Sequence, residues 1–256
     1  MRRTTRFLVA GAAAVAFILS LTAVATAQGR WQWPEHPMNL KVLPKDTHAE
    51  QLRETMGMFV RGLGVRCTFC HVGKEGEPLS SYEFASDEKA NKNRAREMLR
   101  MVHSINERLQ TIDFGEEKRV TVSCATCHRG RPRPTTMVEE LREAYAKGDA
   151  SGAIAHFKEL RDRFYARGTL DFTERPLNTF GYELLGKDDV EGAIAILGFN
   201  AQQFPQSGNV WDSLAEAYLK AGRTEQAAIY YRKSLELNPD NKNALAQLKK
   251  IAAGGE

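Results

Sequence analysis

Two copies of the pattern Cys-x-x-Cys-His constrain this chain more than any other feature of its sequence. The first copy is CTFCH at residues 67–71, and the second is CATCH at residues 124–128. The pattern is typical of c-type haem attachment, in which each thiol adds across a haem vinyl group and the histidine binds the iron. Residues three and four apart share one face of a helix, so a single turn can present all three side chains together.

The chain has four cysteines, and the two motifs use all of them. No thiol therefore remains for a disulfide, a zinc site or a cysteine nucleophile. The sequence predicts two covalently attached haem c groups. The predicted attachment residues are Cys67, Cys70, Cys124 and Cys127, and the predicted iron ligands on the same turns are His71 and His128.

The first 27 residues have the organisation of a secretory signal peptide. Three arginines precede an apolar run from residue 7 to about residue 25, and Ala25-Thr26-Ala27 supplies the small residues of a cleavage site. Because haem is attached to c-type cytochromes on the far side of the membrane, the signal and the motifs together predict export to the periplasm. The apolar run is also close to the length that spans a bilayer, so an uncleaved membrane anchor is the alternative.

Charge and length bound the rest of the chain. The formal net charge of the 256-residue chain is +4 at pH 7, and removal of residues 1–27 with their three arginines lowers it to +1. A near-neutral chain does not attract polyanions, so no nucleic acid is expected as a partner. What remains has the length of one large or two small domains.

Helical periodicity surrounds the two motifs. Apolar residues at helical spacing predict one helix from about residue 49 to the glycines at 62 and 64, just before the first motif, and another from about residue 87 to 109. No run of alternating apolar and polar residues occurs in this half. The region around the motifs is therefore predicted to be helical.

Each haem iron needs a second axial ligand or an open site, and methionine is the usual partner of histidine in electron-carrying cytochromes. On the first helix Met56 lies on the apolar stripe, whereas Met58 is rotated about 200° from it. Met56 is therefore the predicted ligand of the first iron. For the second iron, Met98 and Met101 both border an apolar face, and periodicity does not separate them. His103, which lies off that face, is a third candidate.

These residues resemble the cytochrome c subunit of photosynthetic reaction centres and its non-photosynthetic relatives. The resemblance covers about residues 50–135. It rests on Met56-x-x-Phe59, Leu63-Gly64-Val65-x-Cys67-x-x-Cys70-His71, Ala95-Arg96-x-Met98-x-x-Met101, Ile105-Asn106 and Cys124-x-x-Cys127-His128-Arg129-Gly130 followed by Pro132 and Pro134. In that family each haem follows a helix that carries its axial methionine, which implies Met56 for the first haem. The methionine of the family's Arg-x-Met pattern ligates the second haem, which implies Met98, with Met101 as the alternative.

The departures from the family pattern also matter. The reaction-centre subunit carries four haems in two pairs, whereas this chain has one pair of motifs. A histidine that serves another haem in the full subunit has no counterpart before Cys124, and the lipid-modified cysteine of many members is absent. The resemblance therefore implies the cytochrome fold and a dihaem relative in another respiratory or redox chain, and it does not imply a donor to a photosynthetic pigment pair.

Beyond a basic, proline-rich linker at residues 129–134, the sequence becomes alanine-rich and repeats at 34 residues. Leu177, Phe180, Gly181, Leu184, Ala193, Leu197, Asn200 and Pro205 align with Trp211, Leu214, Ala215, Tyr218, Ala227, Tyr231, Ser234 and Pro239. These are the large and small positions of a tetratricopeptide repeat, whose helix pairs stack around a shared core. A looser copy from Leu141 to about Ala166 is expected before them, and a capping helix from Asn241 to Ala252 after them.

Other charged residues and histidines are expected to be ordinary. The linker arginines could pair with haem propionates or remain in a solvated hinge. His36, His48 and His156 have no motif around them, and Glu140 lies in a helix whose charges follow a solvated pattern.

The predicted fold class is all-α: a signal peptide at 1–27, a dihaem helical domain like that of multihaem cytochromes at 28–135, and a tetratricopeptide-repeat-like array at 136–256. The predicted function is a periplasmic dihaem cytochrome that carries electrons between a donor and an acceptor redox protein by outer-sphere transfer. A membrane-bound redox complex is one expected partner, and the repeat domain is expected to dock a protein or peptide. No acid–base pair stands out, so a carrier is favoured over an enzyme.

Two alternatives remain at this point. A haem enzyme of the peroxidase or oxyanion reductase type would keep one iron open and need a distal acid or base, for which His103 beside an unbound Met98 is the candidate. A redox-linked assembly or scaffold protein would instead use the repeat array as its main functional part.

Overall fold

The computed structural model describes residues 31–254, and the signal peptide predicted at 1–27 lies outside them. The described chain is helical, which confirms the all-α prediction, and its only β pairing is an isolated bridge between Val72 and Glu83. The helices are α1 (Ala49–Leu63), α2 (Ala90–Gln110), α3 (Cys124–His128), α4 (Met137–Phe164), α5 (Glu174–Gly186), α6 (Val190–Gln203), α7 (Gly208–Lys220), α8 (Thr224–Leu237) and α9 (Lys242–Ala253), with 3-10 turns η1 (Cys67–Phe69) and η2 (Leu79–Ser81).

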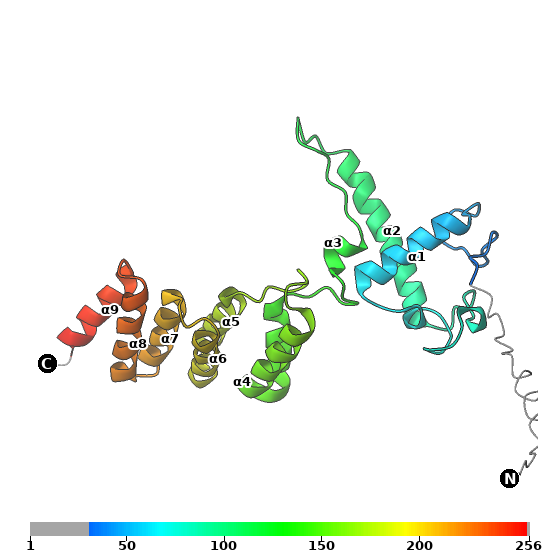
Figure 1. The fold of residues 1–256 in the computed structure, drawn as a ribbon. Coiled ribbons are helices and arrows are strands. Elements are labelled where there is room, and N and C mark those ends of the chain that lie inside the picture. The colour runs from blue at the N-terminus through cyan, green and yellow to red at the C-terminus, as the bar shows by residue number, and fades with distance from the viewer. Residues whose placement is uncertain (1–30, 255–256) are drawn as a thin grey trace, which may run out of the picture.

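The molecule is elongated, with α1, α2 and α3 at one end and a stack of helices from α4 to α9 at the other (Figure 1). The C-terminal part of α2 projects from the first end, and the chain between α2 and α3 returns alongside it (Figure 1). None of the helices within residues 31–254 has the length and apolar character needed to cross a membrane.

The stack from α4 to α9 has a continuous side-chain core. Its largest fully buried side chains are Tyr231, Phe157, Phe180, Met137, Leu141, Leu177, Ile196 and Leu197. The small positions of the repeat are required by packing: a Cβ at Gly181 would lie 2.5 Å from the side chain of Leu197, so only glycine lets α5 and α6 approach this closely. The 34-residue repeat therefore encodes two stacked helix pairs, α5–α6 and α7–α8.

The two ends of the stack are also helical. Helix α4 contains a break at Gly148 and Asp149, where Asp149 has φ of 55°, so the segment is one helix followed by a second. This break is the turn of the looser repeat copy. At the other end, the Asn241 side chain caps α9 by accepting hydrogen bonds from the backbone of Asn243 and Ala244.

The half that carries the two motifs has almost no core of its own. Among residues 31–136, Leu52 is the only buried hydrophobic side chain, and α2 buries no residue completely. Large apolar side chains are exposed there instead: Met58, Val60, Met98, Met101, Ile105 and Val120. A chain of about a hundred residues normally buries enough apolar surface to hold itself together. Apolar side chains of this half instead line a cavity beside the first Cys-x-x-Cys-His motif.

The repeat core yields a paired prediction at Tyr231, which is fully buried and whose hydroxyl has no hydrogen-bond partner within residues 31–254. We expect Tyr231→Ala to lower the free energy of unfolding by about 3–5 kcal/mol because it leaves a cavity. Tyr231→Phe should be neutral or stabilising because it removes an unpartnered buried polar group. Urea unfolding followed by circular dichroism measures both.

The matched control is Ile229→Ala in the same helix, whose side chain is 56% exposed and whose loss should change stability by less than about 0.5 kcal/mol. A loss for Tyr231→Phe as large as that for Tyr231→Ala would show that the hydroxyl, rather than the ring, stabilises this part of the stack.

Candidate haem sites

The first Cys-x-x-Cys-His motif forms a compact turn. It begins with η1, in which the backbone N–H groups of Cys70 and His71 donate to the Cys67 carbonyl at 3.2 and 2.9 Å. This turn places both thiols and the imidazole on one short piece of backbone. Both cysteines are free thiols that are partly buried, and burial is the main reason why the pKa of the Cys70 thiol is raised.

A cavity of about 930 Å³ opens beside this turn. Its volume is at the upper end of the range for ligand pockets in proteins, about 300–1,000 Å³. Its apolar walls come from α1, from α2, from the segment after the motif and from the N-terminal arm at residues 31–43. The lining includes Met56, Phe59, Val65, Leu79, Tyr82, Phe84 and Leu99, together with Cys67, Cys70 and His71.

His71 is prepared to bind a metal inside this cavity. Its ring lines the cavity, its Nδ1 atom is buried, and the backbone of Phe84 interacts with the ring. Burial, followed by the charge of Lys92, lowers the pKa of His71, so the imidazole is neutral at pH 7, which is the form that ligates metals.

Met56 lines the same cavity as His71, whereas Met58 is 45% exposed and does not line it. The structure thus brings together the thiols, the imidazole and the thioether that the sequence predicts for the first haem. The apolar walls and the donor set fit a haem.

The N-terminal arm closes one side of the cavity. Trp31 packs against Phe84 with ring centroids 5.0 Å apart, and Phe84 packs edge-on against His71 at the same distance. The arm therefore contributes an aromatic wall directly beside the predicted iron ligand.

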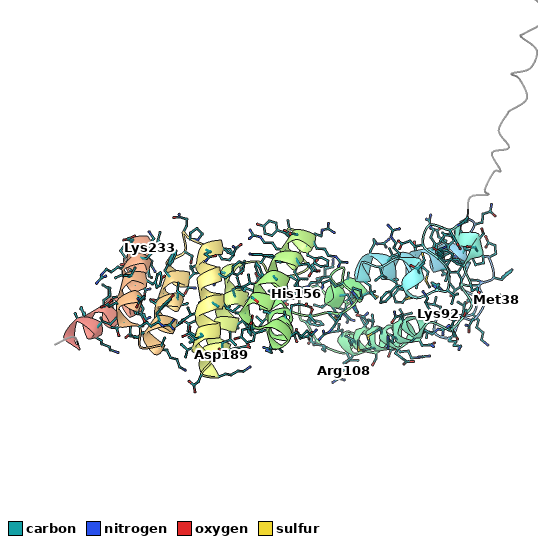
Figure 2. The ribbon with its side chains drawn as sticks, turned by 90° about the horizontal axis from the view of Figure 1, so that it is seen from below. Met38, Lys92, Arg108, His156, Asp189 and Lys233 are labelled. Atoms are coloured by element: carbon teal, nitrogen blue, oxygen red, sulfur yellow. The ribbon has the colours of Figure 1, made fainter. Side chains whose placement is uncertain are left out.

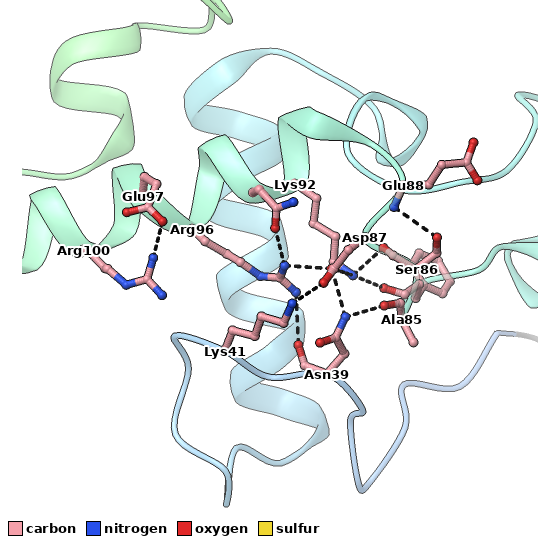
Figure 3. A network of polar contacts seen from close by, with 12 residues as sticks. Asn39, Lys41, Ala85, Ser86, Asp87, Glu88, Lys92, Arg96, Glu97 and Arg100 are labelled. Atoms are coloured by element: carbon pink, nitrogen blue, oxygen red, sulfur yellow. Dashed lines mark hydrogen bonds and ion pairs between the residues drawn. The ribbon is translucent and has the colours of Figure 1, made fainter.

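Asp87 holds this arm to the start of α2 (Figure 3). Its carboxylate accepts from Asn39 at 2.9 Å and pairs with Lys41 at 2.5 Å, both in the arm, and with Arg96 at 2.7 Å and Lys92 at 3.2 Å, both in α2. These contacts, with that of Lys41 the largest, hold the pKa of Asp87 well below its usual range. Three cations share one carboxylate on this wall, so it could also hold the anionic propionates of a haem.

The second motif forms α3, a single helical turn with Ser123 at its N-cap. Its histidine, His128, has Nδ1 at 2.9 Å from the carbonyl oxygen of Arg131. Because a carbonyl can only accept, Nδ1 carries the proton, and Nε2 is left free to bind a metal. Cys124 is partly buried, and burial is the main reason why its pKa is raised; Cys127 is exposed.

Asn106 fixes the approach to this motif. Its side-chain amide donates to the Val122 carbonyl at 2.9 Å and accepts from the Val122 N–H at 2.8 Å, which ties the segment before α3 to α2. At 100° per residue, Met98 lies about 80° around α2 from Asn106 and Met101 about 140°. Met98 is thus closer to the side of α2 that faces the second motif.

The structure does not bring a methionine to the second motif as it does to the first. Met98 and Met101 are 42% and 47% exposed on α2 and do not line the first cavity. Ile105 lies on the same side of α2 as these two methionines. His103 is rotated about 60° from Asn106 in the opposite sense, away from that apolar face.

A glycine contact that sequence reasoning did not predict joins the end of α1, just before the first motif, to the second motif. The Gly130 N–H donates to the Gly62 carbonyl at 2.9 Å, and a Cβ at Gly62 would lie 2.8 Å from the Cβ of Cys124. Gly64 ends α1 at φ 65°, and a Cβ there would lie 2.1 Å from the Gly130 oxygen. In the sequence, Gly62 and Gly64 indicate only the end of a helix and Gly130 only a linker position, so their spacing gives no sign that they meet.

Sequence comparison identifies the family. The model of the photosynthetic reaction centre cytochrome c subunit family matches residues 39–190, more than half of the chain. The chain belongs to this family. It is therefore a c-type cytochrome, a class that binds haem c covalently, and the resemblance predicted from residues 50–135 is confirmed. A tetratricopeptide-repeat model matches residues 208–241, so the cytochrome also has a C-terminal repeat region.

Among curated proteins, the cytochrome is 35% identical over 102 residues to cytochrome c-554 of Chloroflexus aurantiacus, and the match covers 40% of this chain. It spans only 22% of the length of that relative. Solved tetratricopeptide-repeat domains also align with it. The first such domain of Spaghetti (RPAP3), bound to an HSP90 peptide, is 16% identical with a TM-score of 0.33 over 46% of this chain and 91% of that chain. The Arabidopsis OM64 domain is 18% identical with a TM-score of 0.33 over 46% and 93%.

The glycine contact predicts an effect of Gly64→Ala on the second haem. The substitution forces α1 and α3 apart, so we expect less haem on the second motif, counted by mass spectrometry of the purified chain and by its pyridine haemochrome spectrum. Gly115→Ala is the control, because φ at Gly115 is 60° and an alanine there has a similar backbone strain of about 1–2 kcal/mol. A Cβ at Gly115 would have no described atom within 4 Å, so it would disturb no contact. Equal haem contents in the two variants would mean that attachment does not require the contact.

Proposed function

We propose that this cytochrome is an exported, periplasmic carrier with two haems that moves electrons between redox proteins by outer-sphere transfer. The observation that carries the proposal is that Met56 and His71 line one apolar cavity. If Met56 and His71 both bound the first iron, that iron would have no open position for a substrate. An iron of this kind can exchange electrons without binding a reactant.

The haem, when bound, supplies an iron that changes oxidation state. The residues of the chain set the conditions for that change. His71 and Met56 are the proposed axial ligands, and Cys67 and Cys70 fix the group covalently. The apolar walls exclude water and lower the local dielectric constant, and these factors tune the potential of a c-type haem.

For the second haem we propose attachment to Cys124 and Cys127, with His128 and Met98 as iron ligands. The family pattern and the angle of Met98 to Asn106 support Met98 over Met101. The close contact of α1 with α3 supports electron transfer between the haems, because it holds the second motif against the helix that ends just before the first motif.

The remaining parts of the proposal concern location and partners. The basic and apolar N-terminus supports export, with an uncleaved anchor as the alternative. A donor and an acceptor redox protein follow from electron carriage, and a membrane-bound redox complex is one such partner. The stacked helix pairs support docking of a protein or peptide on the repeat half.

Spectroelectrochemical titration tests the axial ligands. Met56→Ala and Met98→Ala should each lower the midpoint potential of one haem, by a tenth or more of the ~0.8 V range that ligation spans, because methionine stabilises the reduced iron. Each should also change the ligand-field bands of that haem. The controls are Met58→Ala on α1 and Met101→Ala on α2. A shift in Met101→Ala but not in Met98→Ala would reassign the second ligand.

The exposure of Met98 favours a second candidate function, a haem enzyme of the peroxidase or oxyanion reductase type with an open second iron. Carbon monoxide discriminates between the two. We expect the reduced native protein to show no spectral change with carbon monoxide, and Met98→Ala to gain one. Binding of carbon monoxide to the native protein would contradict the simple carrier.

A further inference from the structure

One residue of the linker contacts both halves of the molecule. The carbonyl oxygen of Arg131 accepts a hydrogen bond from Nδ1 of His128, and the guanidinium of Arg131 pairs with Glu140 in α4 at 2.6 Å. The same side chain lies over the ring of Phe164, with its Cζ atom 5.5 Å from the ring centroid. The backbone of Arg131 is thus hydrogen-bonded to the predicted haem ligand, and its side chain is bound to the repeat half.

Glu140 is the centre of a buried cluster in the first helix of the stack. One of its oxygens accepts from Arg131 and from the Thr135 hydroxyl at 2.5 Å, and the other lies 2.8 Å from Nε2 of His156. The Arg131 and Glu140 side chains are only 12% and 11% exposed. The expectation that Glu140 and His156 are ordinary solvated residues is therefore wrong, because the break in α4 folds His156 back onto Glu140.

The charges in this cluster are matched. Burial would raise the pKa of Glu140, but hydrogen bonds from His156, Thr135 and Arg131 outweigh it and lower the pKa to about 2. Glu140 is thus ionised at neutral pH and makes charge-assisted hydrogen bonds, which are shorter and stronger than neutral ones. His156 lies on α4, on the side of the stack nearer the haem half (Figure 2).

A neighbouring ion pair between the linker and α4 is exposed, in contrast to the buried cluster. Arg133 in the same linker pairs with Glu143 in the same helix, but these side chains are 65% and 42% exposed. An exposed pair of this kind contributes little to stability. It also has no hydrogen bond that leads to His128.

We propose that Glu140 and His156 are positioning residues for the second haem: they fix Arg131, whose carbonyl orients the ring of His128. The inference rests on the proposed function, in which His128 ligates the second iron. The acceptor on the non-ligating nitrogen of a metal-bound histidine sets its ring orientation and raises its basicity. Through this chain of contacts, which leads to His128 and not to His71, the repeat half sets the potential of the second haem and leaves that of the first unchanged.

The test compares Glu140→Gln with Glu143→Gln in the full-length holoprotein. Glu140→Gln weakens the hold on Arg131, so the His128 hydrogen bond loses alignment and the less basic ligand favours the reduced iron. We expect a higher midpoint potential and altered ligand-field bands for the second haem alone. Glu143→Gln should match the native protein. Glu140→Gln with native values for both haems, or with equal shifts at both, would overturn the proposal.

His156 supplies a second pair of variants if Glu140→Gln folds poorly, since its side chain is 30% exposed and tolerates change. His156→Leu removes a hydrogen bond to Glu140 and should shift the second potential in the same direction. His156→Gln retains a donor and should restore the native value. Shifts of equal size in both variants would contradict a role through Glu140.

His128→Ala separates this inference from the proposed function. If the ligand-field bands of the second haem survive that change, His128 is not its ligand and the proposed function fails at this site. If the bands are lost in His128→Ala while Glu140→Gln behaves like Glu143→Gln, only the positioning inference fails.

Discussion

The apolar walls of the cavity beside the first Cys-x-x-Cys-His motif bury almost nothing against one another, and the order of the N-terminal half depends on the group that they enclose. With Leu52 as its single buried hydrophobic residue between positions 31 and 136, this half gains little from contact of side chain with side chain. A covalently attached porphyrin offers the missing apolar surface. We therefore expect haem attachment to order this half, as metal binding does in other small domains whose folding is coupled to it.

The repeat half, in contrast, is held together by its own buried side chains. Its large and small residues interlock in a continuous core, so its shape is fixed by the chain alone. The contrast explains why the linker is bound to the repeat half. The repeat half folds on its own core and can act as a fixed support for the half that binds haem. Arg131 is where that support reaches a predicted iron ligand, and the buried carboxylate of Glu140 makes the connection stiffer than an exposed ion pair would.

The features predicted from the sequence are those encoded by local spacing. Two motifs, the register of Met56, the ends of α1 and the 34-residue repeat all depend on residues close together in the chain. Contacts between distant residues were missed: Asp87 with the arm, Gly62 with Gly130 and Glu140 with His156. Periodicity could not separate Met98 from Met101 because it gives angles around one helix without the direction of its neighbour, which the Asn106 contact supplies.

The aromatic wall supplied by Trp31 has a practical consequence when this cytochrome is immobilised on an electrode. A tag or tether placed close to Trp31 would disturb the packing against Phe84 and His71, and the measured potential would then describe the attachment as much as the protein. The last helix of the stack lies at the far end of the molecule (Figure 1). Immobilisation through α9 turns the repeat half into a rigid spacer and leaves the haem end facing the solution.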